Sequence, residues 1–183
     1  MNKYYILKSV VENEDYFAEK VSVSHTDITE LSIEGISLID KKIEIELKKN
    51  KGTVKNYIEN LYGLPIVSKL IAETIMNHNL NDIELIEVKV NMKTDLKYYL
   101  LNVLNVIDCI DLEKSIYKLY VPDIILFDSI DKLVIDTTKI KNDIFRIKGL
   151  LLEIIVSEQL KNKLENLKLS ELEFMPIEDF TKE

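Results

Sequence analysis

The residues best suited to chemistry in this sequence are four acids near its longest apolar stretch. Asp108, Asp111 and Glu113 follow the segment from Tyr98 to Ile107, and Asp128 lies further downstream. A cluster of carboxylates binds hard cations such as Mg²⁺ or Ca²⁺, and a bound divalent metal would make it a candidate hydrolase centre. The spacing of Asp108 and Asp111 brings them together only in a helical turn, and the glycine and further oxygen ligands of a calcium-binding loop are absent.

The same acids also fit a structural interpretation. Asp111 would cap a turn, Glu113 would lie just after the cap, where negative charge is favourable, and Asp108 would end the preceding strand. Their carboxylates would then face a basic partner protein. We therefore predict Asp108, Asp111 and Glu113 as partner-binding residues and keep a metal-assisted hydrolase as the alternative. No catalytic, cofactor-binding or metal-binding residue is assigned.

The other reactive side chains give little support to an enzyme. His25 and His78 are the only histidines, and neither lies in a recognisable motif, with His78 expected in a helix as a surface or partly buried residue. Cys109 is the only cysteine, and its apolar neighbours predict an inert thiol with a raised pKa. The four glycines form no phosphate-binding motif, so no cofactor is predicted.

The charge balance points away from nucleic acid. The chain has 32 acids and 24 bases, a net charge of −8, and a surface of that sign repels phosphate backbones while attracting basic proteins. Arg146 is the only arginine, so the planar group that pairs with phosphate or guanine is nearly absent. The single cysteine predicts a reducing compartment, the cytoplasm, and we recognise neither a signal peptide nor a membrane-spanning apolar run.

The stretch from Tyr98 to Ile107 is predicted to be a strand in the middle of a sheet. It is largely apolar on both faces when alternate residues are grouped, and its β-branched and aromatic residues favour a strand over a helix. Elsewhere, the patterns predict strands at Tyr4–Ser9, Ile43–Leu47 and, after a turn at Gly35, Ile36–Leu38, as well as a short helix from Val54 to Leu61 that ends before Gly63 and Pro65.

Two segments of the chain resemble each other. IVSKLIAETIMNHNLNDIEL begins at residue 66 and IVSEQLKNKLENLKLSELEF at residue 155, and at this offset of 89 positions six residues are identical without a gap. Each segment predicts a short strand, a helix and a second strand. The predicted helix caps are Ser68 and Ser157, and the predicted left-handed helix ends are Asn77 and Asn166. An internal duplication would explain the match, and chance similarity of two amphipathic helices is the alternative.

Further strands are predicted at Ile124–Phe127, Lys132–Ile135 and Ile144–Ile147. The fold class is therefore α+β, a strand-rich domain with two similar strand–helix–strand units. We predict a single domain over residues 1–183, which the duplication would divide into an N-terminal half, 1–92, and a C-terminal half, 93–183.

Several of these segments together resemble a known family. YYLLNVLNVIDCIDLEKS, then IFRIKG, then IIVSEQLKNKLENLKLSELEFMP, with LPIVSKLI upstream, resemble the bacterial immunity proteins of polymorphic toxin systems in the family called immunity protein eleven, formerly a domain of unknown function. The likeness is best in the C-terminal part of the chain. Family members tend to have a glycine before the last strand, where this chain has Ser170 and Glu171.

The resemblance implies a protein that is made by the toxin-carrying cell or its siblings and blocks the toxin's C-terminal domain by binding it, without catalysis. It implies no established role for the residues that match its pattern, which are Asp108, Asp111, Ser115, Phe145 and Ser157. The predicted partner is a cognate toxin protein, with no nucleic acid and no membrane. Two alternatives remain: the metal-assisted hydrolase, and a homo-oligomeric structural protein that only the apolar strands suggest.

Overall fold

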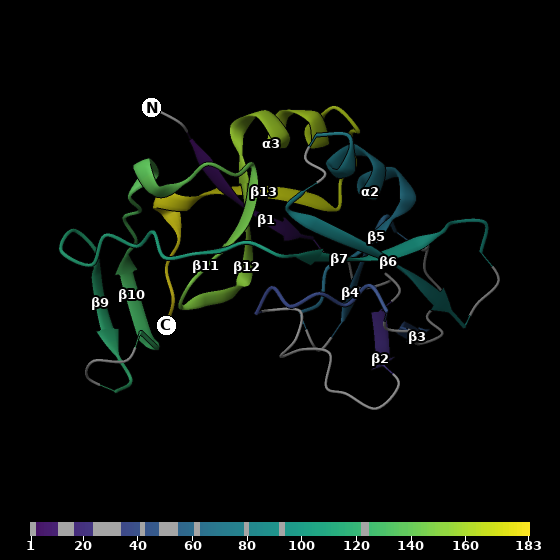
Figure 1. Ribbon diagram of the computed structural model, residues 1–183, viewed down its shortest axis with the longest axis horizontal. Helices are drawn as coiled ribbons and strands as arrows, with labels where there is room; N and C mark the ends of the chain where they lie inside the picture. The colour runs from purple at the N-terminus through teal and green to yellow at the C-terminus, as the bar shows by residue number, and fades with distance from the viewer. Residues whose placement is uncertain are drawn as a thin grey trace.

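The computed structural model describes residues 3–10, 17–23, 34–40, 43–47, 55–60, 63–78, 81–91, 94–121 and 125–183. Within these ranges the chain is rich in strands and has two α-helices, which confirms the predicted α+β class (Figure 1). The described strands form a closed barrel, an open sheet and a two-stranded sheet.

The barrel contains strands from the first part of the chain. Its order is β2-β3-β6-β7-β5-β4, and β4 closes the ring by pairing in parallel with β2. Strand β7 pairs antiparallel with both β6 and β5. Its Leu100 is buried, which fits a small barrel whose interior is filled by side chains. The bounds are β2 Phe17–Val23, β3 Ile43–Leu47, β4 Tyr57–Asn60, β5 Ile66–Ser68, β6 Ile83–Val90 and β7 Tyr98–Val103.

The open sheet has the order β13-β1-β12-β11-β8. Strand β1 lies between β12 and β13 and is antiparallel to both, so the first described strand of the chain is held by two of the last. Strand β8 pairs in parallel with β11 at the opposite edge. The bounds are β1 Tyr4–Ser9, β8 Val106–Ile107, β11 Ile144–Ile147, β12 Leu150–Ser157 and β13 Leu172–Pro176.

A two-stranded sheet forms the end of the molecule away from the barrel (Figure 1). Its strands are β9, Ile116–Leu119, and β10, Phe127–Lys132, which pair antiparallel. The C-terminal segment returns to this sheet, because Ile130 and Lys182 form a bridge. Two short 3-10 helices, η1 (Thr137–Lys139) and η2 (Ile177–Asp179), complete this end of the fold.

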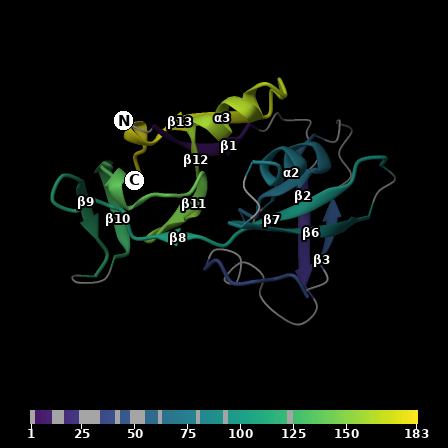
Figure 2. The ribbon, with the colours of Figure 1, turned by 45° about the horizontal axis from the view of Figure 1, so that its top comes forward.

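The two α-helices lie beside each other on one side of the molecule, as Figures 1 and 2 show. Helix α2 spans Lys69–Met76 and helix α3 spans Glu158–Glu165. Each places buried aliphatic residues in one shared hydrophobic cluster, which also contains residues from strands of the barrel and of the open sheet. A second cluster joins the open sheet to β9 and β10, so the open sheet packs against both the helices and the two-stranded sheet through apolar contacts.

The predicted repeat matches the observed elements. At the offset of 89 positions, the bounds of α2 coincide with those of α3, and β6 and β13 begin at equivalent residues. The predicted strand–helix–strand order of both units is confirmed. Their origin by duplication stays a prediction, because similar bounds alone do not establish common descent.

The strand register reveals a further correspondence that the sequence analysis missed. Tyr98 and Tyr99 of β7 lie opposite Ser68 and Val67, and Tyr4 and Tyr5 of β1 lie opposite the equivalent Ser157 and Val156. The motif Lys-Tyr-Tyr occurs at residues 3–5 and again at 97–99, and this signal could have revealed the match. Strand β1 therefore occupies the place in the second unit that β7 occupies in the first.

The two sheets do not divide at residue 92. Strand β7 follows that point in the sequence and completes the barrel, whereas β1 precedes it and joins the open sheet. The division into halves 1–92 and 93–183, and the single domain over 1–183, stay predictions.

Two predicted elements before the repeat are wrong. The segment predicted as a helix from Val54 to Leu61 contains strand β4, which pairs with β5 and β2. Pairing on both sides outweighs the helical spacing of its apolar residues, and Tyr57 and Ile58 also favour a strand. Residues 36–38 form no strand, although the turn at Gly35 is present with a φ of +70°. Leu38 instead donates its amide hydrogen to the Glu84 carboxylate.

The strands near residue 130 differ from the prediction as well. The predicted strand Ile144–Ile147 is confirmed as β11. Strand β10 begins at Phe127 and ends at Lys132, so it lies between the two predicted segments Ile124–Phe127 and Lys132–Ile135. Residue 124 lies outside the described residues. Strand β9 was not predicted, although its alternating exposure is typical of a strand with one face covered.

The predicted helix caps hold in only one unit. The Ser157 hydroxyl accepts a hydrogen bond from the Leu160 amide, whereas Ser68 makes no such bond. Asn77 and Asn166 both adopt right-handed conformations, so their predicted left-handed role is wrong. The left-handed residue after α3 is Lys168, with a φ of 55°.

Candidate functional site

The predicted acidic residues lie on the loop that follows β8. Backbone hydrogen bonds hold this loop in place: the Asp111 amide donates to the Val134 carbonyl, and the Cys109 carbonyl accepts from the Asp136 amide. The Asp108 side chain is 57% exposed, and its Oδ2 atom lies 3.1 Å from Nζ of Lys148. Asp108 is therefore a surface carboxylate on a well-fixed backbone.

Asp111 has the turn-capping role that its structural interpretation predicted. Its Oδ1 atom accepts a hydrogen bond from the Lys114 amide, and its Oδ2 atom lies 2.6 Å from Nζ of Lys114. The hydrogen bond from the Lys114 side chain holds the pKa of the Asp111 carboxyl below its usual value. Glu113 lies exposed in the same turn. Two of the three predicted contacts, Asp108 and Glu113, therefore present exposed side chains, while Asp111 shapes the turn between them.

The described residues contain no group of three or more histidine, cysteine, aspartate or glutamate side chains arranged to hold a metal ion. Asp128 is exposed on β10, and it does not join the acids of the β8 loop in such a group. The hydrolase alternative needs these carboxylates to converge, and no observation in the described part of the chain favours it.

The single cysteine lies in the core, as predicted. Cys109 has no exposed surface, and burial raises its pKa to about 11. At neutral pH the side chain is therefore a thiol, which is a poor nucleophile and a poor metal ligand.

His78 joins three parts of the fold. Its Nδ1 atom lies 2.6 Å from Nζ of Lys163 on α3, and its Nε2 atom lies 3.1 Å from Oδ2 of Asp143, which precedes β11. The distance to Asp143 suits an ion pair when the ring is protonated, although the orientation does not meet hydrogen-bond geometry. His78 was predicted to lie in a helix, but α2 ends at Met76 and His78 lies in the turn that follows, where these contacts give it a structural role. His25 lies outside the described residues.

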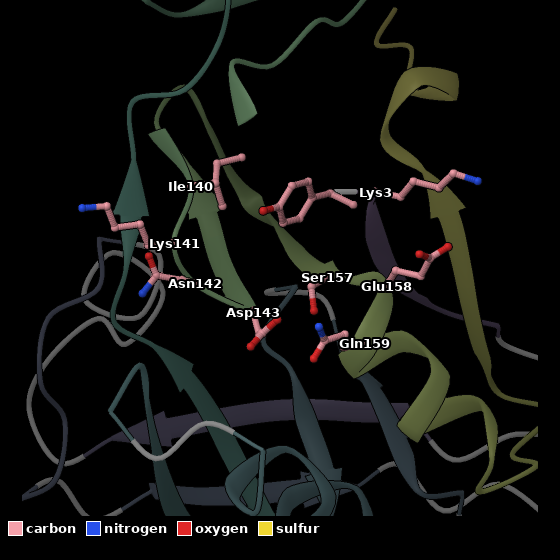
Figure 3. Close-up of a pocket in the computed structure, with 9 residues that line it drawn as sticks. Lys3, Ile140, Lys141, Asn142, Asp143, Ser157, Glu158 and Gln159 are labelled. Atoms are coloured by element: carbon pink, nitrogen blue, oxygen red, sulfur yellow. The ribbon is translucent and has the colours of Figure 1, made fainter. Parts of the chain in front are cut away.

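A small polar cavity of about 210 Å³ lies at the start of α3. Figure 3 shows Lys141 and Asn142 on one side of it and Lys3 and Glu158 on the other, with Asp143 and Ser157 between them. Its charged side chains are of both signs, and the Ser157 hydroxyl is already used as the helix cap. The cavity brings together no nucleophile and base of the kind that catalysis needs.

A larger apolar groove was missed by the sequence analysis. It lies beside the turn between β11 and β12, and its volume is about 640 Å³. Gly149 forms this turn with a φ of +90°, and a Cβ atom there would lie 2.7 Å from the Ile125 side chain, so the position requires glycine. The remaining lining residues are Lys8, Leu126, Lys148, Leu150, Leu151, Leu152, Glu153, Phe180, Thr181 and Lys182.

Arg146, the only arginine, is fully buried. Its Nη1 atom donates to the Leu151 carbonyl at 2.5 Å, while Nε and Nη2 have no hydrogen-bond partner in the described part of the chain. Burial lowers the pKa of its guanidinium to about 10. A buried side chain contacts no phosphate backbone, so the one residue best suited to nucleic-acid recognition is unavailable for it.

Comparison with protein-family models places the chain beside one described family. The model of a family described as "Immunity protein family (Imm11)" matches residues 3–179 of the 183 in the chain. A search of curated proteins finds no match. No helix in the described ranges has both the length and the apolar character needed to span a membrane.

Proposed function

This chain belongs to the Imm11 immunity protein family, and from that premise we propose that it binds a cognate bacterial toxin domain and neutralises it without catalysis. The observation that carries this proposal is the family match, which extends from the start of β1 to the end of η2 and therefore includes the barrel, the open sheet, the two-stranded sheet and both α-helices. Neutralisation by binding needs a surface but no reactive centre.

The exposed acids of the β8 loop are the proposed contacts. Asp108 and Glu113 project from a backbone that hydrogen bonds fix on both sides, so binding would cost little loss of conformational freedom. The net charge of −8 favours a basic toxin, and charges of opposite sign raise the association rate and the specificity more than the final affinity. Asp111 would act by holding the turn that presents Glu113.

The proposed setting is the cytoplasm of a bacterium with a polymorphic toxin system. The support is the single buried cysteine, which needs no oxidising compartment. The immunity protein would meet the toxin in the compartment where the toxin acts.

Co-expression tests the proposed function. The chain is produced together with the toxic C-terminal domain encoded beside its gene, and both cell survival and co-purification are scored. We expect survival and a stable complex. Cell death with no complex would remove the proposal.

The contact assignment is tested with matched double variants. We expect Asp108→Asn with Glu113→Gln to slow association with the toxin about tenfold at low salt, and less at high salt, because screening weakens the attraction of surface charges. Glu87→Gln with Asp95→Asn removes the same charge from exposed positions on the barrel side and is the control. Equal rates and equal salt dependence for both double variants would refute the assignment.

A further inference from the structure

The groove beside the β11–β12 turn exposes apolar side chains on a rigid frame. Leu152 is 60% exposed and Leu126 is 51% exposed, while Leu150 and Phe180 form the buried floor. The frame is fixed because β11 and β12 pair across the turn and the Lys182 ammonium donates to the Phe127 carbonyl. Large exposed side chains of this kind mark interaction sites when they gather around a concave surface.

The apolar surface continues beyond the groove. The Tyr120 amide donates to the Leu126 carbonyl, so the two residues face each other across the β9–β10 pair, and Tyr120 is 71% exposed. Val121 is also largely exposed. Exposed tyrosine and leucine side chains that lie close together can form the buried centre of a protein interface.

The charge of the groove is opposite to that of the whole chain. Three lysines, Lys8, Lys148 and Lys182, line it with a single acid, Glu153. Burial raises the pKa of Glu153, so its negative charge is disfavoured there. A groove with a basic rim, in a chain with a net charge of −8, favours an apolar ligand segment that carries carboxylates.

The groove is continuous with the proposed contact surface. Lys148 lines the groove and pairs with Asp108 on the β8 loop, so one side chain belongs to both surfaces. We propose that the groove binds a segment of the toxin in which a large apolar side chain is flanked by acidic residues. This inference rests on the proposed function and adds the docking position and the chemistry of the bound segment.

Substitutions at Leu152 test both parts of the inference. Leu152→Asp and Leu126→Asp each place a charge at the apolar contact, and we expect each to weaken toxin binding about tenfold or more in calorimetry. Leu152→Lys removes the same apolar contact but adds the opposite charge. We expect it to bind more tightly than Leu152→Asp, with a difference that shrinks as salt is added, because the bound segment is acidic.

Ile39→Asp and Leu70→Asp are the matched controls, since both side chains are comparably exposed and lie outside the groove. We expect both to bind the toxin within about twofold of the wild type, and thermal unfolding establishes that all variants are folded.

Each outcome separates the two proposals. If the wild type binds and protects while the Leu152 and Leu126 variants bind equally well, the groove inference is overturned and the immunity function stands. If Leu152→Lys binds no better than Leu152→Asp at low salt, the acidic segment is overturned. A wild-type dimer that Leu152→Asp converts to a monomer would make a second copy the occupant and overturn the toxin assignment. A wild type that neither binds nor protects removes the function and the inference with it.

Discussion

The first unit, β5-α2-β6, and the second unit, β12-α3-β13, have helices with equivalent bounds, and the strands on either side end and begin at equivalent residues. The two units nevertheless use their identical serines differently. The Ser157 hydroxyl caps α3, whereas the Ser68 hydroxyl donates to Oδ1 of Asn56 at 2.8 Å. In both units the serine amide donates to the carbonyl of the residue just before the neighbouring strand: Asn56 before β4 in the first unit, and Asp143 before β11 in the second. The comparison shows that the backbone hydrogen bond of the serine is the same in both units, whereas the partner of its hydroxyl depends on which side chains lie nearby.

The neighbouring strands, β4 and β11, differ more sharply. Tyr57 and Ile144 lie opposite the equivalent Val67 and Val156. Two positions further along, Glu59 and Arg146 each pair with a parallel strand, β2 or β8, so they occupy matching places. Burial raises the pKa of Glu59 and lowers that of Arg146, so in each unit it opposes the charged form. The equivalent positions therefore hold ionisable groups of opposite sign, and in both the charged form is disfavoured by desolvation.

The largest expected effect tests whether β1 and β7 are true counterparts. Ile6 and Leu100 lie opposite the equivalent Ile155 and Ile66, and both are buried. We expect Ile6→Ala and Leu100→Ala each to lower the free energy of unfolding by about 2–5 kcal/mol, since each leaves a cavity in a packed core. Urea denaturation measures both, and a loss below about 1 kcal/mol for one of them would break the correspondence.

The next effect concerns Arg146, whose buried charge has a single hydrogen bond. We expect Arg146→Met to be more stable than the wild type by about 1–4 kcal/mol, because an apolar side chain of similar volume avoids the desolvation of the guanidinium. Chemical denaturation at neutral pH measures the difference. A clear loss of stability would mean that the interaction of Arg146 with Tyr57 and Glu153 outweighs its burial.

Glu84 and Glu173 are identical residues at equivalent positions with different surroundings. Burial acts to raise the pKa of Glu84, but hydrogen bonds from Ser37, Leu38 and Asn102 outweigh it and hold that pKa below the ordinary 4.5. The folded state thus binds fewer protons than the unfolded state just below pH 4.5, so this contribution to stability is present above that pH and is lost as the pH falls through the folded pKa.

We therefore expect Glu84→Gln to cost about 1.5 kcal/mol at pH 7, and the cost to diminish in acid. Denaturation curves from pH 7 to pH 3 measure it. Glu173→Gln is the control, because Glu173 is exposed, and it should change little at any pH. A cost for Glu84→Gln that is independent of pH would contradict the assigned hydrogen bonds.

The smallest effect separates the two serines. We expect Ser157→Ala to cost about 1 kcal/mol and Ser157→Asp to restore most of it, since aspartate also caps helices. We expect Ser68→Asp to remain destabilising, because its carboxylate would face Oδ1 of Asn56 instead of a free amide. Thermal unfolding compares the variants. Rescue by aspartate at both positions would show that Ser68 caps α2 after all.

Much of the fold was predictable where local pattern and tertiary pairing agree. The strands β1, β3 and β11 follow their alternation and their β-branched residues, and both helices follow their serine positions. The predicted strand Tyr98–Ile107 is right only in its first part, because β7 ends at Val103 and Val106–Ile107 form β8 of the open sheet. The prediction failed at β4, where pairing with strands on both sides overrode a helical spacing, and at Asn77 and Asn166, where asparagine tolerates the left-handed conformation but does not require it.

The site was predictable in part. The turn formed by Asp111 follows from local spacing, and so does the buried thiol of Cys109. The groove was not predictable, because its walls come from four segments distant in sequence and only their packing brings them together. Leu126 and Leu152 appear in the sequence as ordinary apolar residues.

The position of β1 has a consequence for the order in which this protein is made. During synthesis β1 leaves the ribosome before its partners, β12 and β13, which are the last two strands of the described ranges. The barrel has all its strands once Val103 has emerged, so we expect it to assemble while the open sheet is still incomplete. The groove needs Phe180 and Lys182, so it would be completed only after these residues have emerged, well after the last strand of the barrel.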